Sequence, residues 1–460
     1  MESDRASLTR RDFLRALAAG AVAASLPARA LAKTATERPN FVVIFTDDQG
    51  YQDVGCFGAP KIKTPHLDRM AAEGMKFTDF YVAASVCSPS RAALLTGCYP
   101  TRTGVTRVLF PRDNTGLKPG MKTIAEVLKT RGYATACIGK WHLGHTPPHL
   151  PTFHGFDYYF GIPYSNDMRP TPVMRNTETV EEPANQATLT QRYTEEAVKF
   201  VRANRDKPFF LYLPHTMPHV PLFVSETFKD KSAGGLYGDV IEEIDWSTGE
   251  ILKTLKGLGL DSKTLVVYTS DNGPWLSKKA HGGCALPLRD GKFSTYEGGF
   301  REPCIMRWPG TIPAAAVCSE TALTMDLLPT FAKLAGADLP AGYALNGKDI
   351  SALMTRPGAK TPHDAFFYYR GTTLDAVRSG QWKAILYAKG ADGRPGKPHE
   401  LYDLKADIGE ATDVASANPD VVARLAALAE AGVKANGGNF GRGVPKKKPA
   451  KKTPTKAAAT

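Results

Sequence analysis

The alternation of short apolar runs with helical patterns constrains this fold more than any other feature. Four runs rich in β-branched and aromatic residues each end in polar residues, at 41–45, 134–138, 209–213 and 265–268. Between them, apolar residues recur every three or four positions over 123–131, 193–204 and 240–258. This alternation predicts an α/β fold, in which a mostly parallel central sheet is flanked by helices on both faces.

Polar residues follow each of the four predicted strands. In chain order they are Asp47 and Asp48, Lys140 and His142, His215 and His219, and Asp271 and Asn272. In open α/β sheets, ligands bind beyond the carboxyl ends of the strands. The topology alone therefore predicts that these side chains converge on one rim of the sheet.

The pattern changes near residue 337, which suggests a second, smaller domain. Short strands typical of an antiparallel sheet are predicted at 366–369, 376–378, 382–387 and 401–404, and a helix from Pro419 to about Lys434. We therefore expect a catalytic domain over 38–336 and a C-terminal α+β subdomain over 337–436 that is built on a short antiparallel sheet.

The first 32 residues resemble a twin-arginine export signal. Arg10 and Arg11 precede an uncharged stretch over 16–27, and small residues around 28–32 offer two possible cleavage sites. The stretch is shorter than the roughly 20 residues that cross a bilayer, so no membrane anchor is expected. The sequence thus predicts a periplasmic or secreted bacterial protein with the twin-arginine translocase as a partner. The alternative is a disordered basic start that holds two arginines by chance.

The net charge of +12 comes mostly from the two ends of the chain. Residues 1–32 carry +2 and residues 442–460 carry +7, which leaves about +3 for the body. Residues 437–460 are therefore expected to form a basic disordered tail, because their Lys, Pro, Ala and Thr content cannot build a core. The alternative is a tether to a polyanion such as a sulfated polysaccharide. Nucleic acid is not an expected partner.

The segment 85–97, which reads SVCSPSRAALLTG, carries the most chemical information. Cys87 precedes a predicted helix and Arg91 lies one turn later, so thiol and guanidinium can face one pocket. A helix amino end and a guanidinium suit a tetrahedral oxyanion. From these residues alone, a free buried cysteine is the commoner alternative. The chain holds seven cysteines with no paired C-x-x-C zinc spacing, and their disulfide connectivity stays open.

Two of the polar pairs indicate a metal site. Asp47, Asp48, Asp271 and Asn272 offer only oxygen ligands, which favours a hard divalent cation over zinc. Ca²⁺ is expected in preference to Mg²⁺, because it tolerates higher and less regular coordination. Either pair alone could instead form a turn or a helix cap. Two pairs at the ends of predicted strands favour the metal site.

The motif CSPSRAALLTG resembles the C-x-P-S-R signature of the type I sulfatases, and the chain is similar to the arylsulfatase A branch. The resemblance extends to five further motifs: DDQG at 47–50, GKWHLG at 139–144, HVP at 219–221, SDNGP at 270–274, and GK at 291–292 with TYEGGFREP at 295–303. It implies an alkaline phosphatase-like fold and oxidation of Cys87 to formylglycine by a formylglycine-generating enzyme, a transient partner. It also implies that residue 87 joins the four oxygen ligands at the metal.

The activity that this resemblance implies is hydrolysis of a sulfate monoester, such as an aryl sulfate or a sulfated sugar or glycolipid. In the implied mechanism the formylglycine hydrate attacks sulfur, and His219 or Lys292 protonates the leaving alcohol. His142 then removes the proton of the second hydroxyl, so that sulfate is expelled. The resemblance assigns sulfate binding and proton transfer to Arg91, Lys140, His142, His219 and Lys292.

Three other polar residues are weaker candidates. His215 competes with His219 for the histidine role, and we favour His219 because only it is followed by x-Pro as in the family. Ser165 and His281 are candidates for substrate contacts, although a role in loop structure explains both equally well.

Two other functions remain open from the sequence. Related folds attack phosphorus, so the chain could be a phosphomonoester or phosphonate hydrolase, which paired assays on aryl sulfate and aryl phosphate would separate. It could also be a non-catalytic protein that binds sulfated glycans through the basic tail. Unmodified Cys87 in the native protein would favour that alternative.

Overall fold

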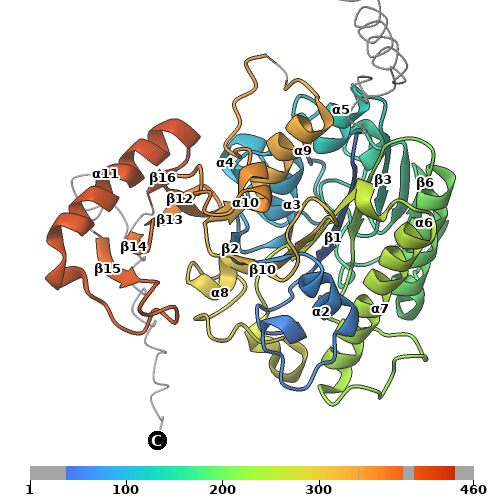
Figure 1. Ribbon diagram of the computed structural model, residues 1–460, viewed down its shortest axis with the longest axis horizontal. Helices are drawn as coiled ribbons and strands as arrows, with labels where there is room; N and C mark the ends of the chain where they lie inside the picture. Colours follow the sequence, from blue (N-terminus) through green and yellow to red (C-terminus); the bar gives the residue numbers. More distant parts are fainter. Residues whose placement is uncertain (1–37, 340, 387–397, 441–460) are drawn as a thin grey trace, which may run out of the picture. The chain divides into compact units, whose positions relative to one another are not determined.

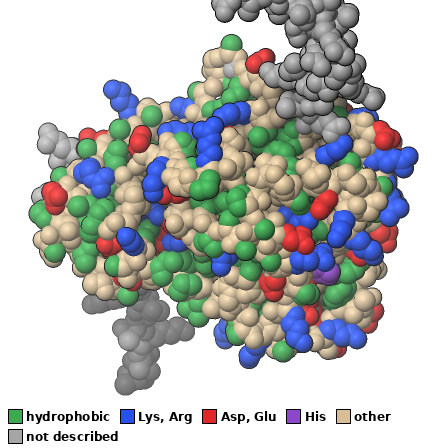
Figure 2. Space-filling view, in the orientation of Figure 1, with side chains coloured by type: hydrophobic (Ala, Val, Ile, Leu, Met, Phe, Trp, Pro, Cys, Tyr) green, Lys and Arg blue, Asp and Glu red, His purple; other side chains and the backbone are tan. Residues whose placement is uncertain are grey.

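The computed structural model describes residues 38–339, 341–386 and 398–440 (Figure 1). The predicted export signal at 1–32 lies outside these residues, as do residues 441–460 of the predicted tail. In the described part of the chain, no helix combines the length and the apolar character that crossing a membrane requires. Lys and Arg side chains lie interspersed with Asp and Glu on the face in Figure 2, as the small charge of the body leads us to expect.

The larger sheet has eleven strands, and its middle is parallel. The five parallel strands are, in spatial order, β8 (Thr264–Ser270), β1 (Asn40–Thr46), β7 (Phe209–Pro214), β3 (Ala134–Ile138) and β4 (Tyr158–Gly161). Every residue of β1, β3, β7 and β8 is buried, as expected for strands covered on both faces. The predicted α/β architecture is confirmed.

Further strands, most of them in antiparallel pairs, extend the sheet on both sides; β10 and β11 pair in parallel with β2. Next to β8 lie β9 (Arg301–Arg307), β2 (Met75–Tyr81) and the short strands β10 (Ala316–Cys318) and β11 (Ala322–Leu323). β9 runs antiparallel to both β8 and β2. Next to β4 lies the hairpin of β5 (Val173–Arg175) and β6 (Glu178–Glu181). The sequence patterns predicted none of these additional strands.

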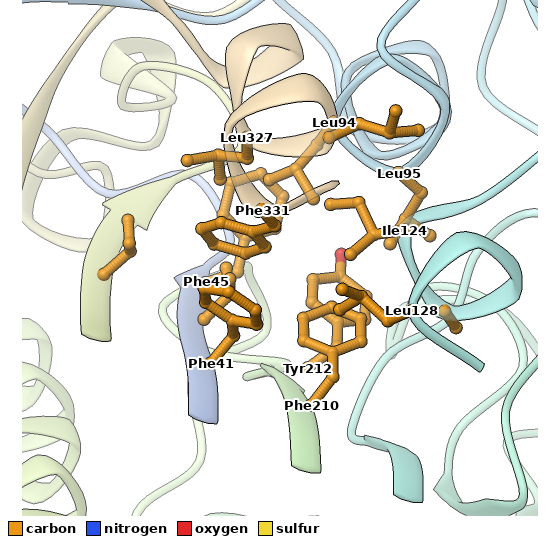
Figure 3. Packing of buried hydrophobic residues seen from close by; sticks show 14 of the residues in the cluster. Phe41, Phe45, Leu94, Leu95, Ile124, Leu128, Phe210, Tyr212, Leu327 and Phe331 are labelled. Atoms are coloured by element: carbon orange, nitrogen blue, oxygen red, sulfur yellow. The ribbon is translucent and has the colours of Figure 1, made fainter. Parts of the chain in front are cut away.

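Two apolar layers cover the larger sheet. Phe41 and Phe45 of β1 pack with Phe210 and Tyr212 of β7 against helices α3, α5 and α9 (Figure 3). The intervening residues Val42 and Ile44 face α2, α6 and α7 on the other side, which follows from the alternation of side chains along a strand. The helices are α2 (Pro65–Ala72), α3 (Cys87–Thr96), α4 (Pro100–Thr103), α5 (Ile124–Lys129), α6 (Leu189–Ala203), α7 (Gly235–Gly257), α8 (Glu297–Phe300), α9 (Leu327–Ala335) and α10 (Ser351–Thr355).

Short 3₁₀ turns connect several of these elements. They span Gly55–Phe57, Pro151–Phe153, Gln186–Thr188, Asp261–Lys263, Leu276–His281, Thr324–Asp326 and Ala415–Ala417. The turn Leu276–His281 follows the carboxyl end of β8 and therefore borders the rim on which the polar residues were predicted to converge.

The C-terminal part forms a small antiparallel sheet, as predicted. It consists of β12 (Phe366–Arg370), β13 (Thr373–Ser379), β14 (Trp382–Leu386) and β15 (Pro398–Asp403), with β16 (Asn439–Phe440) parallel to β13. Helix α11 (Pro419–Asn436) contacts this sheet. Tyr81 and Phe300 from the larger part join Phe366 and Tyr368 in one apolar cluster, which packs the two sheets together.

Candidate active site

The carboxylates that follow β1 and β8 form buried ion pairs with Arg91, and the lysine that follows β3 joins them. The Arg91 Nη2 atom lies 2.7 Å from Asp271 Oδ2 and 3.3 Å from Asp47 Oδ2, and the Lys140 ammonium group pairs with Asp47. Burial opposes ionisation of Asp47, but Lys140 and Arg91 outweigh it and hold the pKa of that carboxyl well below its usual range. The strand ends therefore assemble a cluster of alternating charge on one rim.

Asp48 is the centre of a second set of contacts on the same rim. Its carboxylate lies 2.7 Å from Lys292 Nζ and 3.6 Å from His219 Nε2, and it accepts a 2.7 Å hydrogen bond from Asn272 Nδ2. Burial disfavours the charge of Lys292, but Asp48 outweighs it and raises the pKa of the ammonium group. The structure thus brings His219 and Lys292 to one carboxylate.

Cys87 begins α3 and is only 2% exposed. Burial raises the pKa of its thiol to about 11. Lys140 and Lys292 lower this pKa, and Asp47 and Asp271 raise it. A thiol with this pKa is protonated at neutral pH and is a poor nucleophile. Residue 87 therefore lies within the charged cluster, where an unmodified cysteine has little reactivity.

His142 is held in one tautomer by the backbone. Its Nε2 atom lies 2.8 Å from the carbonyl oxygen of Leu109, so Nε2 carries the proton that is donated. Its Nδ1 atom is buried without a hydrogen-bond partner in the described structure. Burial and the neighbouring Lys140 hold the pKa of the imidazole well below 6.5, so Nδ1 offers a free lone pair.

His219 is oriented by Asn166. The Nδ1 atom lies 3.0 Å from Asn166 Oδ1 and 2.7 Å from the Val220 carbonyl oxygen, which turns Nε2 toward Asp48. Asn166 is itself held by hydrogen bonds to Gln186 and to the backbone of Pro221. Sequence reasoning missed Asn166. The apolar run at 158–161, read as a fifth parallel strand, would have placed it at the same rim.

The three weaker candidates have different surroundings in the structure. The ring of His215 is buried against α7, with Nε2 3.5 Å from Ser247 Oγ, and burial lowers its pKa to about 3. Ser165 lies in the charged cluster, where its hydroxyl accepts a 3.1 Å hydrogen bond from Lys140. His281 is exposed in the turn Leu276–His281.

The oxygen donors fit a hard divalent cation. Asp47 Oδ1 and Asn272 Oδ1 are buried and have no hydrogen-bond partner in the described structure, which is uncommon for buried polar atoms. Ligand atoms of Asp47, Asp48 and His219 lie within 4.8 Å of one another. Carboxylate and amide oxygens grouped in this way suit calcium or magnesium better than a softer metal.

Glu302, which lies in the motif at 295–303, is a buried carboxyl to which the sequence assigned no role. Both of its oxygens lack a hydrogen-bond partner in the described structure, and its side chain is fully buried on β9. Burial, with Asp271 and Asp48 nearby, raises its pKa well above 4.5. No pattern in the sequence signals this shift in pKa, because it depends on carboxylates that the fold brings close.

Comparison with known proteins gives matches along most of the chain. The family model described as Sulfatase matches residues 39–337, and that of the N-sulphoglucosamine sulphohydrolase C-terminal region matches residues 289–430. Arylsulfatase A of Homo sapiens is 40% identical over 91% of this chain and 90% of that protein. N-acetylgalactosamine-6-sulfatase of Rattus norvegicus is 43% identical over 78% of this chain and 73% of that protein. The crystal structure of PsFucS1 sulfatase from Pseudoalteromonas sp. has a TM-score of 0.79 at 26% identity, covering 88% of this chain and 92% of that one.

Proposed function

Because this chain belongs to the sulfatase family of sulfuric ester hydrolases, we propose that Cys87, oxidised to formylglycine, is its nucleophile. The observation that carries the proposal is the position of Cys87 at the buried amino end of α3, among the charges of Lys140, Lys292, Asp47 and Asp271. A protonated thiol there has no evident use, whereas an aldehyde hydrate in its place would face groups that bind an anion. The enzyme that would make this change is a transient partner.

Each step of sulfate transfer is assigned to particular residues of the chain. Formylglycine supplies a hydrate whose one hydroxyl attacks sulfur and whose other hydroxyl allows the sulfated state to collapse to the aldehyde. Arg91 and Lys140 bind the sulfuryl oxygens, where charge spreads in the transition state. His219 Nε2 or Lys292 Nζ gives a proton to the leaving alcohol, since both face the same carboxylate. His142 Nδ1 accepts the proton of the second hydroxyl, because its Nε2 proton is already donated to Leu109.

We propose Ca²⁺ as the divalent cation, held by Asp47, Asp48, Asp271, Asn272 and the residue at 87. A bound cation would polarise the sulfate ester as a Lewis acid. The unpartnered oxygens of Asp47 and Asn272 support this donor set. Removing the metal should lower the melting temperature, because a ligand that binds only the folded state stabilises it by about 2.7 kcal/mol at a hundredfold excess over Kd. Calorimetry after dialysis against EGTA measures the loss. Recovery with Mg²⁺ at lower concentrations than with Ca²⁺ would contradict the choice of calcium.

Export and domain division remain proposals that rest on the sequence. We propose that residues 1–32 direct twin-arginine export to the periplasm or the medium. We also propose that 38–336 is the catalytic domain, with 337–436 as a C-terminal subdomain and 437–460 as a basic tail. Mass measurement of the exported protein would show cleavage near residue 32, and retention of the full N-terminus after export would contradict the signal.

Peptide mass spectrometry across Cys87 tests the nucleophile directly. Protein produced with a formylglycine-generating enzyme should carry an aldehyde at position 87 and hydrolyse aryl sulfate in preference to aryl phosphate. Protein with the thiol, and the Cys87→Ser variant, should fail to turn over. Sulfatase turnover at the normal rate by protein whose residue 87 is wholly a thiol would overturn the proposal.

A further inference from the structure

The segment 291–293 joins the two loops that carry the nucleophile and the acidic pair. The Lys292 N–H donates to the Pro274 carbonyl oxygen at 3.0 Å, and the Phe293 N–H donates to the Ser85 carbonyl oxygen at 3.1 Å. Ser85 lies two residues before Cys87, and Pro274 lies two residues after Asn272. These two hydrogen bonds hold the backbone of Phe293 beside the site.

Phe293 adopts a conformation that a bulky residue rarely takes. Its φ angle is +72°, in the left-handed region that glycine occupies without strain. Its side chain is nevertheless 50% exposed, so it contributes little to the apolar core. A strained backbone that presents an exposed aromatic ring next to a catalytic lysine indicates a use for the ring outside folding.

The neighbouring Trp275 is already occupied by cations. Lys292 Nζ lies 4.6 Å and Lys278 Nζ 4.3 Å from the centre of its ring, and the His219 ring centre is 5.7 Å away. Trp275 meets Phe293 edge-on, with ring centres 5.5 Å apart at 77°. Trp275 thus holds Lys292 in place. Lys292 Nζ also lies 5.5 Å from the centre of the Phe293 ring, but half of the Phe293 side chain is open to solvent.

We propose that Phe293 is a specificity-determining residue that packs against a ring in the leaving alcohol. The inference rests on the proposed function, in which Arg91 and Lys140 bind the sulfuryl oxygens and Lys292 is one of two donors of a proton to the leaving alcohol. The oxygen of that alcohol would then lie close to Lys292 Nζ, which is 5.5 Å from the centre of the exposed Phe293 ring. An arene or the C–H face of a pyranose offers the flat apolar surface that such a ring contacts.

Binding to a protein that cannot turn over tests this role. In a Cys87→Ala background, calorimetry gives Kd for phenyl sulfate, galactose 6-sulfate and the ring-free methyl sulfate. Adding Phe293→Gly should raise Kd for a ring-bearing ester by about tenfold, the loss expected for one aromatic contact, and leave Kd for methyl sulfate unchanged. A higher Kd for phenyl sulfate alone would assign an arene, and a higher Kd for galactose 6-sulfate alone would assign a pyranose. A higher Kd for both would support a contact with either kind of ring.

Two control variants separate the ring from the backbone. Phe293→Tyr keeps an aromatic ring and should keep the Kd of the parent. Ala315→Gly removes a side chain from a second position with a left-handed backbone, φ +52°. Ala315 lies next to the start of β10, at the end of the strands away from the site, so this variant should change no Kd. Unchanged Kd for both ring-bearing esters, or an equal loss for methyl sulfate, would overturn the role of Phe293.

This measurement is independent of catalysis. If protein with oxidised Cys87 hydrolyses no sulfate ester, the proposed nucleophile is wrong, but the ratio of Kd values still decides whether Phe293 contacts a ring. If turnover is normal and the ratio does not change, the proposed function stands and the role of Phe293 does not.

Discussion

Three side chains of the site should each be important for the rate of sulfate transfer. Lys292 pairs with Asp48 and Arg91 with Asp271, and both would carry positive charge next to the sulfate ester, whereas His142 would accept a proton. We expect Lys292→Ala, Arg91→Ala and His142→Ala each to lower kcat by at least about 10²- to 10³-fold. The control is Lys278→Ala, a lysine on the same rim that should keep near-normal kcat. Steady-state assays with aryl sulfate measure both, and circular dichroism checks that each variant is folded.

The state of His142 predicts how rate depends on pH. Burial disfavours the charged imidazole, so its pKa lies below 6.5, and Nδ1 stays able to accept a proton as pH falls through that value. The acid limb of kcat should therefore lie below pH 6.5, and activity should be lost only at lower pH. A kcat profile on aryl sulfate measures this limb. A limb at or above pH 6.5 that disappears in His142→Ala would contradict the assignment.

The strand ends predicted that Asp47, Lys140 and Asp271 meet at one edge, whereas the family resemblance was needed to place Arg91 and Lys292 with them. Asn166 and Phe293 were not predicted. The role of Asn166 depends on the imidazole that it contacts across the loop, and that of Phe293 depends on a positive φ angle. Neither contact nor torsion can be read from a local pattern.

Among the elements, the amino end of α5 was predicted most closely. Thr123 and Glu126 have the T-x-x-E spacing that is typical of a capping box, and they form one: Thr123 Oγ1 accepts from the Glu126 N–H at 3.1 Å, and Glu126 accepts from the Thr123 N–H at 3.1 Å. Thr123 Oγ1 also donates to the His154 carbonyl oxygen. Local spacing determines this feature, so sequence alone was sufficient.

Loss of this cap should be measurable as stability. Thr123→Ala removes the acceptor for the Glu126 N–H and should lower the free energy of unfolding by about 1 kcal/mol, up to about 2 kcal/mol. Thr123→Ser keeps the hydroxyl and should lose much less. Urea unfolding followed by circular dichroism compares the two variants, and equal losses would show that the methyl group matters rather than the cap.

β9 shows where element prediction failed. It contains Pro303 and the charged residues Arg301, Glu302 and Arg307, which do not resemble a central strand. Arg301 pairs with Asp79, and Arg307 pairs with Asp261, so the two arginines find their partners among residues distant in sequence. A pattern search cannot anticipate such partners, and it therefore favours a loop.

At the scale of the molecule, one buried lysine joins the two sheets. Lys383 of β14 lies 3.0 Å from Glu297 at the start of α8 and 2.8 Å from Glu410, and it donates to the Thr295 carbonyl oxygen. All three ionic side chains are buried, and Glu297 also pairs with Arg301, whose Nη1 atom lies 3.5 Å from it. The contact links the small sheet to the loop that follows Lys292.

Removing this lysine should cost far more than removing an exposed one. Lys383→Ala removes the cation that pairs with both Glu297 and Glu410, and should lower the free energy of unfolding by about 3–5 kcal/mol. Lys405→Ala, an exposed lysine in the same part of the chain, should change it by less than about 0.5 kcal/mol. Urea unfolding of both variants measures the difference, and similar values would show that the buried pair is not balanced by Lys383.

The position of β1 at the centre of the larger sheet also limits when residue 87 can be reached. β1 is complete by residue 46, yet its two neighbours are β7 and β8, which leave the ribosome some 170 and 220 residues later. Until then the strands that complete the sheet are missing, and the cysteine is accessible to another protein. Once β8 is in place the thiol is buried, so the enzyme that we propose to oxidise it would have a limited time to reach it, set by the order of synthesis.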